Sequence, residues 1–257
     1  MRKPIVGVGW KMYMNDMTSA KKLMRDLSVY ADKYPDIETF LFPAAMHMQS
    51  AYEILGQTHL GFGAQNISEF ETGNYTGENS VLLLKSIGGT YAEVGHAERR
   101  ELFGETDEQV RKKIRLCISN GITPVVCVGE SAQSVENGTS RALLRTQVEH
   151  ALTGLTVQEL VQSILVYEPV WAIGRDKPAA PEYVEDVHRY LRELIRELFA
   201  EAADSMRIIY GGSNNPETCR AFIHQSNIDG LFVGRSALQA ENFGEILNVV
   251  FEEKCRR

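Results

Sequence analysis

The chain has 257 residues, of which 44% are hydrophobic and 24% are charged, so the composition excludes a disordered protein and fits one closed α/β barrel or two smaller domains. Its 27 Lys and Arg against 34 Asp and Glu give a net charge of −7, which argues against nucleic acid as the main partner but leaves room for a small anion held by local donors. The sequence contains no run of about 18 apolar residues, so no membrane span is predicted. The four cysteines lack a CxxC spacing and predict neither a disulfide framework nor a zinc site, so we expect a reducing cytoplasm.

Short apolar runs rich in β-forming residues recur along the whole chain, and each is followed by a helical pattern. Their nearly continuous apolar character is what parallel strands buried on both faces require. The predicted strands span 5–10, 38–42, 60–65, 91–96, 123–129, 163–169, 207–212 and 229–235.

The segments between these runs carry the signals of helices. An apolar face at 3.6-residue spacing predicts a helix over 18–34. A capping box, T-D-E-Q, opens a predicted helix over 106–120. A proline at the first position opens a long amphipathic helix over 181–203, and Pro216 opens a shorter one.

Eight strands that alternate with about eight helices predict a parallel sheet. We therefore predict an α/β fold in which residues 1–257 form a single domain, a (β/α)8 barrel with surrounding helices. An open, doubly wound sheet would give almost the same alternation, so the periodicity alone leaves that alternative open.

Polar residues follow the strands at the ends where parallel barrels place their chemistry. Lys11 follows the first predicted strand, His96 ends the fourth and Glu168 the sixth, while glycine turns at 211–213 and 234–236 follow the last two. A base, an electrophile and a cation beside an anion cradle are what proton abstraction next to a carbonyl needs. Singly, each has a plainer interpretation: a solvated lysine, a core histidine, a glutamate capping a loop, or a simple turn.

The segment after Glu168 is apolar although it is predicted to be exposed on the rim, which suggests a lid that excludes water. The alternatives are a dimer contact or a loop that fills the core. The lid candidates are Pro169, Val170, Trp171, Ala172, Ile173, Gly174 and Lys177.

Motifs across nearly the whole chain resemble those of the triosephosphate isomerase family, in family order. The resemblance implies a TIM barrel and a cofactor-free aldose–ketose isomerase that interconverts glyceraldehyde 3-phosphate and dihydroxyacetone phosphate without a metal. The motifs are GWKM (9–12), GAQN (63–66), YTGE (75–78), EVGHAERR (93–100), FGET (103–106), VCVGE (126–130), VYEPVWAIG (166–174), IIYGGS (208–213) and DGLFVGRSAL (229–238).

The same resemblance implies roles for the polar residues. Glu168 would move a proton between C1 and C2, and His96, as neutral imidazole, would polarise the carbonyl. Lys11 would hold the phosphate and stabilise negative charge, with Glu98 interacting with it. The backbone N–H groups that would bind the phosphate belong to Gly174, Ser213, Gly234 and Arg235.

Family members are usually homodimers in which the YTGE loop inserts beside the partner's active site. The resemblance therefore implies a homodimer in which Thr76, at the tip of loop 67–80, lies near the Lys11 and His96 of the other copy. The expected small-molecule partner is a phosphorylated sugar. Neither nucleic acid nor a membrane is expected as a partner.

Several positions depart from the usual family pattern. Gly9 stands where Asn is usual, Ala97 replaces Ser, Arg235 replaces Gly, Asn214 replaces an apolar residue, and the lid tip at 175–176 reads Arg-Asp. Gly9 could make room beside the substrate and Arg235 could add a cation, and relatives with these features resemble isomerases of a four-carbon ketose phosphate, L-erythrulose 1-phosphate. Drift is the alternative explanation, and triose phosphate remains the main reading.

A hypothesis from another class is a barrel that binds a sugar phosphate without converting it, as a sensor or scaffold. The intact Lys11, His96 and Glu168, together with the lid sequence, argue against it.

Overall fold

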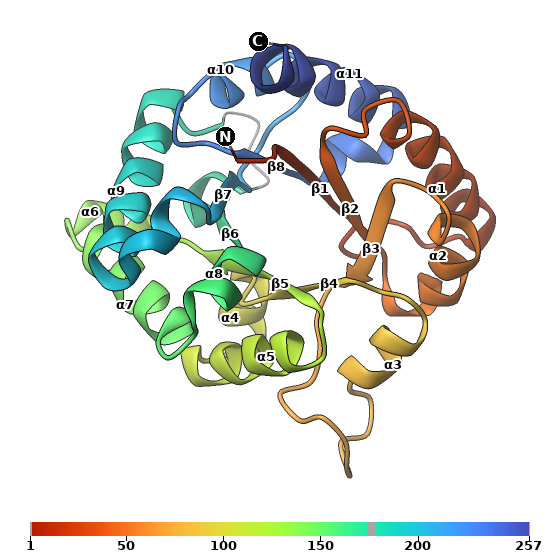
Figure 1. Cartoon of the computed structure of the whole chain (residues 1–257), viewed down its shortest axis with the longest axis horizontal. Helices are drawn as coiled ribbons and strands as arrows, with labels where there is room; N and C mark the ends of the chain where they lie inside the picture. The colour runs from red at the N-terminus through yellow and green to blue at the C-terminus, as the bar shows by residue number, and fades with distance from the viewer. Residues whose placement is uncertain (1, 174–177, 257) are drawn as a thin grey trace.

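Eight parallel strands close into a barrel in sequence order, as the computed structural model shows for the described residues, 2–173 and 178–256 (Figure 1). β1 pairs with β2 on one side and with β8 on the other, so the sheet has no edge. This closure excludes the open doubly wound sheet and confirms the predicted (β/α)8 TIM barrel. The strands are β1 (Ile5–Gly9), β2 (Glu38–Phe42), β3 (Leu60–Ala64), β4 (Tyr91–Val94), β5 (Thr123–Val128), β6 (Ile164–Tyr167), β7 (Arg207–Tyr210) and β8 (Gly230–Val233).

Helices surround the barrel on all sides (Figure 1). None of those in the described parts of the chain is long and apolar enough to cross a membrane. The α-helices are α1 (Met17–Ala31), α2 (Met48–Leu55), α3 (Val81–Ser86), α4 (Ala97–Phe103), α5 (Asp107–Ser119), α6 (Ala132–Glu136), α7 (Ser140–Leu152), α8 (Val157–Gln162), α9 (Pro181–Phe199), α10 (Cys219–Ile223) and α11 (Ala240–Val250).

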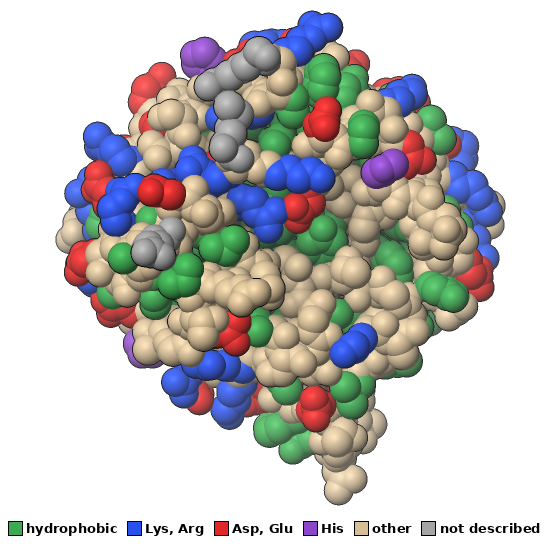
Figure 2. All heavy atoms as spheres, viewed as in Figure 1, with side chains coloured by type: hydrophobic (Ala, Val, Ile, Leu, Met, Phe, Trp, Pro, Cys, Tyr) green, Lys and Arg blue, Asp and Glu red, His purple; other side chains and the backbone are tan. Residues whose placement is uncertain are grey.

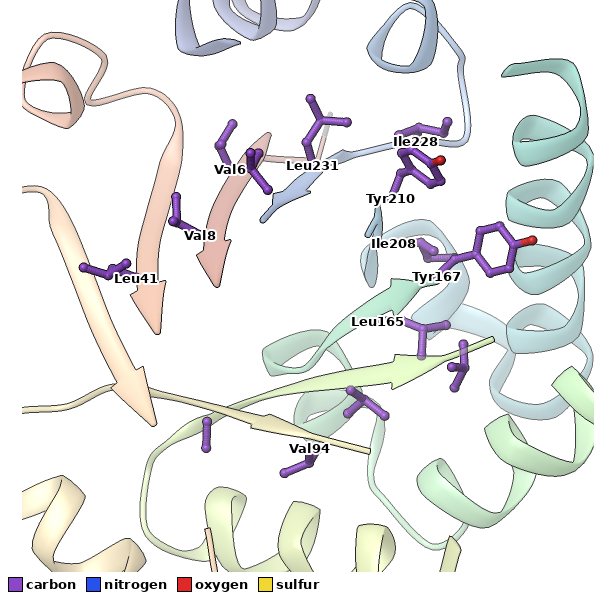
Figure 3. Close-up of a cluster of buried hydrophobic side chains, with 14 of the residues drawn as sticks. Val6, Val8, Leu41, Val94, Leu165, Tyr167, Ile208, Tyr210, Ile228 and Leu231 are labelled. Carbon is purple, nitrogen blue, oxygen red and sulfur yellow. The ribbon is translucent and has the colours of Figure 1, made fainter. Parts of the chain in front are cut away.

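Successive side chains of a strand point to opposite faces of the sheet, and the two sets form two separate hydrophobic cores. Outward-facing residues such as Val6 and Leu41 pack beneath the helices (Figure 3). Inward-facing rings fill the barrel interior, where Phe40 and Phe42 have ring centroids 6.1 and 5.8 Å from that of Phe232. Because this interior is packed solid, a ligand can enter only at the rim.

Local signals located the starts of helices better than their ends. The predicted capping box forms at α5, where Thr106 and Gln109 exchange side-chain to backbone hydrogen bonds. The helix expected over 181–203 ends as α9 at Phe199, because Ala200 has φ +41° and begins a short 3-10 helix. The strands stop one or two residues before the predicted ends that carry rim residues, because those residues leave the hydrogen-bonded ladder.

A buried ion pair ties α9 to the closing strands. Arg192 donates to Asp229 at 2.6 Å and to the backbone oxygens of Ala203 and Met206, at 2.6 and 2.9 Å. Asp229, just before β8, also accepts the backbone N–H of Ile208 in β7 at 2.8 Å. The pair therefore holds one helix against the two strands that complete the barrel.

We predict that Asp229→Asn lowers the free energy of unfolding by about 3–5 kcal/mol, because it leaves the Arg192 charge buried without a counter-charge. The matched control is Asp204→Asn in the pair Arg196–Asp204, where Asp204 is 80% exposed and the expected loss is below about 1 kcal/mol. Urea unfolding of both variants measures the difference. Equal losses would contradict the structural role of the buried pair.

Candidate active site

Lys11, His96 and Glu168 meet at one rim of the barrel, as expected for residues that follow parallel strands. His96 Nε2 lies 3.3 Å from Glu168 Oε1, and Lys11 Nζ lies 2.5 Å from Glu98 Oε1. The second oxygen of Glu98 lies 3.8 Å from His96 Nδ1 and links the two pairs. The four predicted site residues therefore form one charged cluster.

The backbone of Lys11 is held in an unusual conformation. Its φ of +49° lies in the left-handed region, which costs a non-glycine residue roughly 1–2 kcal/mol. Gln65, just after β3, donates from Nε2 to the carbonyl oxygens of Lys11 and Phe42, at 2.9 and 3.1 Å. Gln65 belongs to the GAQN motif, for which no role was predicted, and in the structure it supports Lys11.

His96 is the N-cap of α4, and this fixes its tautomer. The backbone N–H of Glu98 donates to Nδ1 at 3.2 Å, so the proton of the neutral ring lies on Nε2, which faces Glu168. Burial lowers the pKa of His96, whereas Glu168 and Glu93 raise it, and their combined effect is upward. A charged ring would need a proton on Nδ1 as well, so the hydrogen bond from Glu98 favours the neutral imidazole.

Glu168 is buried, and its side chain passes close to Gly211. A Cβ atom on Gly211 would lie 2.9 Å from Glu168 Cγ, so only glycine leaves this path open. Burial raises the pKa of Glu168, but His96, Lys11 and the Ala97 N–H together outweigh that effect and hold the pKa below its usual value. Glu168 is therefore an ionised carboxylate at neutral pH.

Glu93 is a further carboxyl group in the site. It belongs to a predicted strand and to the EVGHAERR motif, but no role was predicted for it. It faces inward from β4, is 6% exposed, and lies with Oε1 at 4.0 Å from His96 Nε2. The available signal was an acidic residue inside an otherwise apolar run.

The phosphate-binding residues proposed from the resemblance lie at the same rim, with Gly174 outside the described residues. Ser213 follows β7, and its hydroxyl donates to the carbonyl oxygen of Ala172 in the lid segment at 3.1 Å. Gly234 precedes a short 3-10 helix, Arg235–Leu238, and a Cβ atom on it would meet nothing within 4 Å. The space in front of Gly234 is open to a ligand.

The first residues of the lid segment are held by a hydrogen bond from the Trp171 side chain and are not fully exposed. Trp171 was expected to be exposed, but it is half-buried, because its Nε1 donates to Glu130 Oε1 at 2.9 Å. The same oxygen accepts the hydroxyls of Tyr167 and Tyr183, at 2.8 and 2.9 Å. Glu130 was named in the VCVGE motif without a role. The predicted lid residue Lys177 and the tip at 175–176 lie outside the described residues.

Two of the unusual positions bear on the longer substrate. Gly9 was expected to open room beside the substrate, but the ring of Phe232 lies against it, 3.0 Å from where a Cβ atom would stand. Arg235, which stands in place of a glycine, has no positive φ, so the arginine there causes no left-handed backbone strain. Its side chain is exposed. Neither position now supplies a structural argument for a longer substrate.

A cavity of about 760 Å³ contains Lys11, His96, Glu98 and Glu93 in its lining. It continues past Leu102 and other exposed apolar side chains towards loop 67–80. In the described part of the chain, no group of three or more His, Cys, Asp or Glu residues is arranged to hold a metal ion. The arrangement offers an imidazole and a cation in the lining of one space, with the buried carboxylate of Glu168 in contact with the imidazole.

Comparisons with known proteins agree with this geometry. The model of a family described as triosephosphate isomerase matches residues 4–250. A probable triosephosphate isomerase 2 of Listeria monocytogenes is 37% identical over 99% of this chain and 100% of its own length. Triosephosphate isomerases of Caldanaerobacter subterraneus and Solibacter usitatus are 39% and 38% identical, each over 96% of this chain and 100% of the relative.

We predict that Glu130→Gln lowers the melting temperature by about 3–10 °C, because three donors converge on a buried carboxylate and an amide oxygen accepts them more weakly. Glu136→Gln is the matched control, since Glu136 is exposed at the end of α6. Thermal unfolding followed by circular dichroism measures both variants. A Glu130→Gln protein as stable as the control would contradict the role of the cluster.

Proposed function

The chain belongs to the triosephosphate isomerase family, and from this premise we propose that it interconverts glyceraldehyde 3-phosphate and dihydroxyacetone phosphate. The observation that carries the proposal is the contact of 3.3 Å between Glu168 and His96, which lines one cavity together with Lys11. An ionised base beside a neutral imidazole is the pair that moving a proton next to a carbonyl needs.

Glu168 starts the reaction in this proposal. Its carboxylate removes a proton from the carbon next to the carbonyl, and the electrons of that C–H bond form the C–C double bond of an enediolate. In the free enzyme the carboxylate contacts His96 and the Ala97 N–H, at 3.3 and 3.5 Å. The incoming carbonyl oxygen replaces Glu168 as the partner of His96 and frees the base to turn towards carbon.

His96 and Lys11 stabilise the charge that the base creates. The Nε2–H of His96 donates to the carbonyl oxygen as negative charge develops, and the ring passes a proton between the two substrate oxygens. Glu168 then returns its proton to the neighbouring carbon, which completes the isomerisation. The ammonium of Lys11, held by Glu98, lies where it can offset the charge of the enediolate and the phosphate.

The phosphate and the lid complete the proposed site. Backbone N–H groups at Ser213, Gly234 and Arg235, with Gly174, bind the phosphate, and the open space in front of Gly234 supports this placement. Residues 169–177 act as the lid, whose anchored start at Trp171 gives it a fixed hinge. Water exclusion matters because an exposed enediolate phosphate eliminates its phosphate group.

Steady-state kinetics with the purified protein tests the proposal directly. Glyceraldehyde 3-phosphate should be converted with a higher kcat/KM than L-erythrulose 1-phosphate, because the space beside Gly9 is filled by Phe232. A higher value for the four-carbon substrate would replace the triose reading. Binding without turnover of either sugar phosphate would mean a non-catalytic barrel.

We also propose a homodimer whose interface borders the active site. Met12, Leu102 and Phe103 are 82%, 73% and 68% exposed and line the cavity where it leaves the barrel. Loop 67–80 projects from the barrel, and hydrophobic side chains gather at its base (Figures 1 and 2). A second copy supplies both a loop and a groove, so the contact is self-complementary and brings Thr76 to the neighbouring cavity.

The setting of the enzyme is proposed from its chemistry and its thiols. The reaction is a step of glycolysis and gluconeogenesis. Cys117, Cys127 and Cys219 are buried free thiols, and burial raises the pKa of Cys117 to about 12, as suits a reducing cytoplasm. All eight strands belong to one sheet, which supports a single domain over residues 1–257.

We predict that Glu168→Asp lowers kcat on the order of 100-fold while KM changes little, because one methylene fewer moves the carboxylate about 1 Å from the carbon. The initial rates in both directions measure this effect. Exposed Glu101 on α4 provides the control Glu101→Asp, which should leave both constants unchanged. Near-normal kcat in Glu168→Asp would contradict the assignment of the base.

We predict that deleting 74–78 gives monomers with very low activity, because the groove of each copy then lacks the loop that completes it. Leu102→Lys should also dissociate the dimer, since it places a charge on the apolar groove, whereas Val157→Lys, at an exposed position on α8, should not. Sedimentation equilibrium and kcat measure both effects. A fully active monomeric deletion variant would contradict the proposed interface.

A further inference from the structure

Glu93 lies in the floor of the substrate cavity, where the proposed mechanism assigns it no task. It projects inward from β4 and lines the same cavity as Lys11 and His96. Its Oε1 lies 4.0 Å from His96 Nε2 and accepts a weak hydrogen bond from the Cys127 thiol, with Sγ at 4.0 Å. A carboxyl group in this place needs an explanation, because burying a charge without a strong partner is costly.

The groups around Glu93 do not neutralise it by a direct ion pair. Lys11, after β1, is paired with Glu98 of α4, and the His96 ring, after β4, lies closer to Glu168 than to Glu93, at 3.3 against 4.0 Å. Glu168, after β6, is a second carboxylate, and the Cys127 thiol of β5 is uncharged because burial raises its pKa far above neutrality. Lys11 and His96 thus already have the carboxylates of Glu98 and Glu168 as partners, and an anionic substrate would add further negative charge beside Glu93.

These surroundings favour the protonated form of Glu93. Burial, with Glu168 and Glu98, raises the pKa of the carboxyl group to about 7, against the opposing effects of His96 and Lys11. A bound phosphate ester and a developing enediolate would favour the proton further. The neutral acid has an O–H group that can donate a hydrogen bond.

The distance to His96 puts that donor within reach of the reacting oxygen. Two atoms 4.0 Å apart can share one hydrogen-bond partner, since a point about 2.9 Å from each of them exists. An oxygen bound to His96 Nε2 can therefore also lie within hydrogen-bond distance of Glu93 Oε1. Gly9, the last residue of β1, adds no side-chain donor, and the Phe232 ring lies against it.

We propose that Glu93 is a further catalytic residue, which binds substrate as a neutral carboxylic acid and donates a hydrogen bond to the oxygen that His96 polarises. The proposal rests on the proposed isomerase function. The proton stays on Glu93 throughout, and no bond to carbon forms or breaks at this residue. Its effect is to stabilise the negative charge of the enediolate with a second fixed donor.

A pair of substitutions separates a neutral donor from a carboxylate. Glu93→Gln keeps the size and has N–H donors, so its kcat should stay within about 3-fold of the wild type, whereas Glu93→Leu has no donor and should lose kcat on the order of 100-fold with little change in KM. If Glu93 worked as an ionised group that orients His96, Glu93→Gln would lose as much as Glu93→Leu, and the proposal would be overturned. Unchanged kcat in Glu93→Leu would overturn it as well.

The pH profile gives a readout that a purely structural role would not change. The pKa of Glu93 is raised to about 7, so the donor is present below that pH and is lost as the pH rises through it. Wild-type kcat/KM should therefore fall as the pH rises through about 7, and Glu93→Gln should lack this fall. The control Glu101→Gln should keep it. A wild-type profile without the fall, or the same fall in Glu93→Gln, would count against the proposal.

Infrared difference spectroscopy with 2-phosphoglycolate, labelled with ¹³C at its carboxyl group, tests the protonation state without turnover. The wild type should show the C=O band of a protonated carboxylic acid on binding, and Glu93→Gln should lack it. The absence of the band from the wild type would overturn the proposal even if Glu93→Leu failed to fold. If the wild type isomerised neither triose phosphate, the proposed function would fail, and this band would still decide the role of Glu93 in binding an anion.

Discussion

The pairing of β1 with β8 is the constraint from which the site follows. It joins the first strand of the sequence to the last and leaves no free edge. All strands run the same way, so the residues that follow them lie around one rim. Lys11, His96 and Glu168 are separated by long stretches of sequence but come together because the barrel closes. Lys11 and His96 line one cavity, and Glu168 contacts His96 at 3.3 Å. The buried pair Arg192–Asp229 reinforces the same closure from outside the sheet.

The chemistry of the rim depends on how a few charges share a space with little water. Glu168 stays ionised because His96, Lys11 and the Ala97 N–H outweigh its burial. At His96 the N–H group that the start of α4 directs at Nδ1 favours the neutral ring, whereas Glu168 and Glu93 raise the pKa. Glu93, deeper in the barrel, lacks such donors and tends to keep its proton. Carboxyl groups a few ångströms apart thus take different protonation states, which is the condition for dividing a reaction among them.

Much of the fold and part of the site could be predicted from sequence patterns. The strand runs, the capping box at Thr106 and the order of polar residues predicted the barrel and its rim, because these signals depend on local spacing. The patterns did not reveal that Gln65 supports Lys11 or that Glu130 anchors Trp171, because those contacts join residues from different strands and loops. The absence of a side chain at Gly9 suggested empty space. The sequence could not show that Phe232, which is more than 200 residues away along the chain, packs against it.

The sequence by itself determined the alternation of strands and helices, the family motifs and the identity of the residues at the strand ends. Those properties are written in neighbouring residues and need no knowledge of distant contacts. The tertiary structure decided the tautomer of His96, the ionised state of Glu168, the filled space beside Gly9 and the position of Glu93 in the lining of the cavity. Each of these depends on burial and on distances between groups far apart in sequence. Electrostatic energies vary steeply with both quantities, and they are fixed only when the barrel closes.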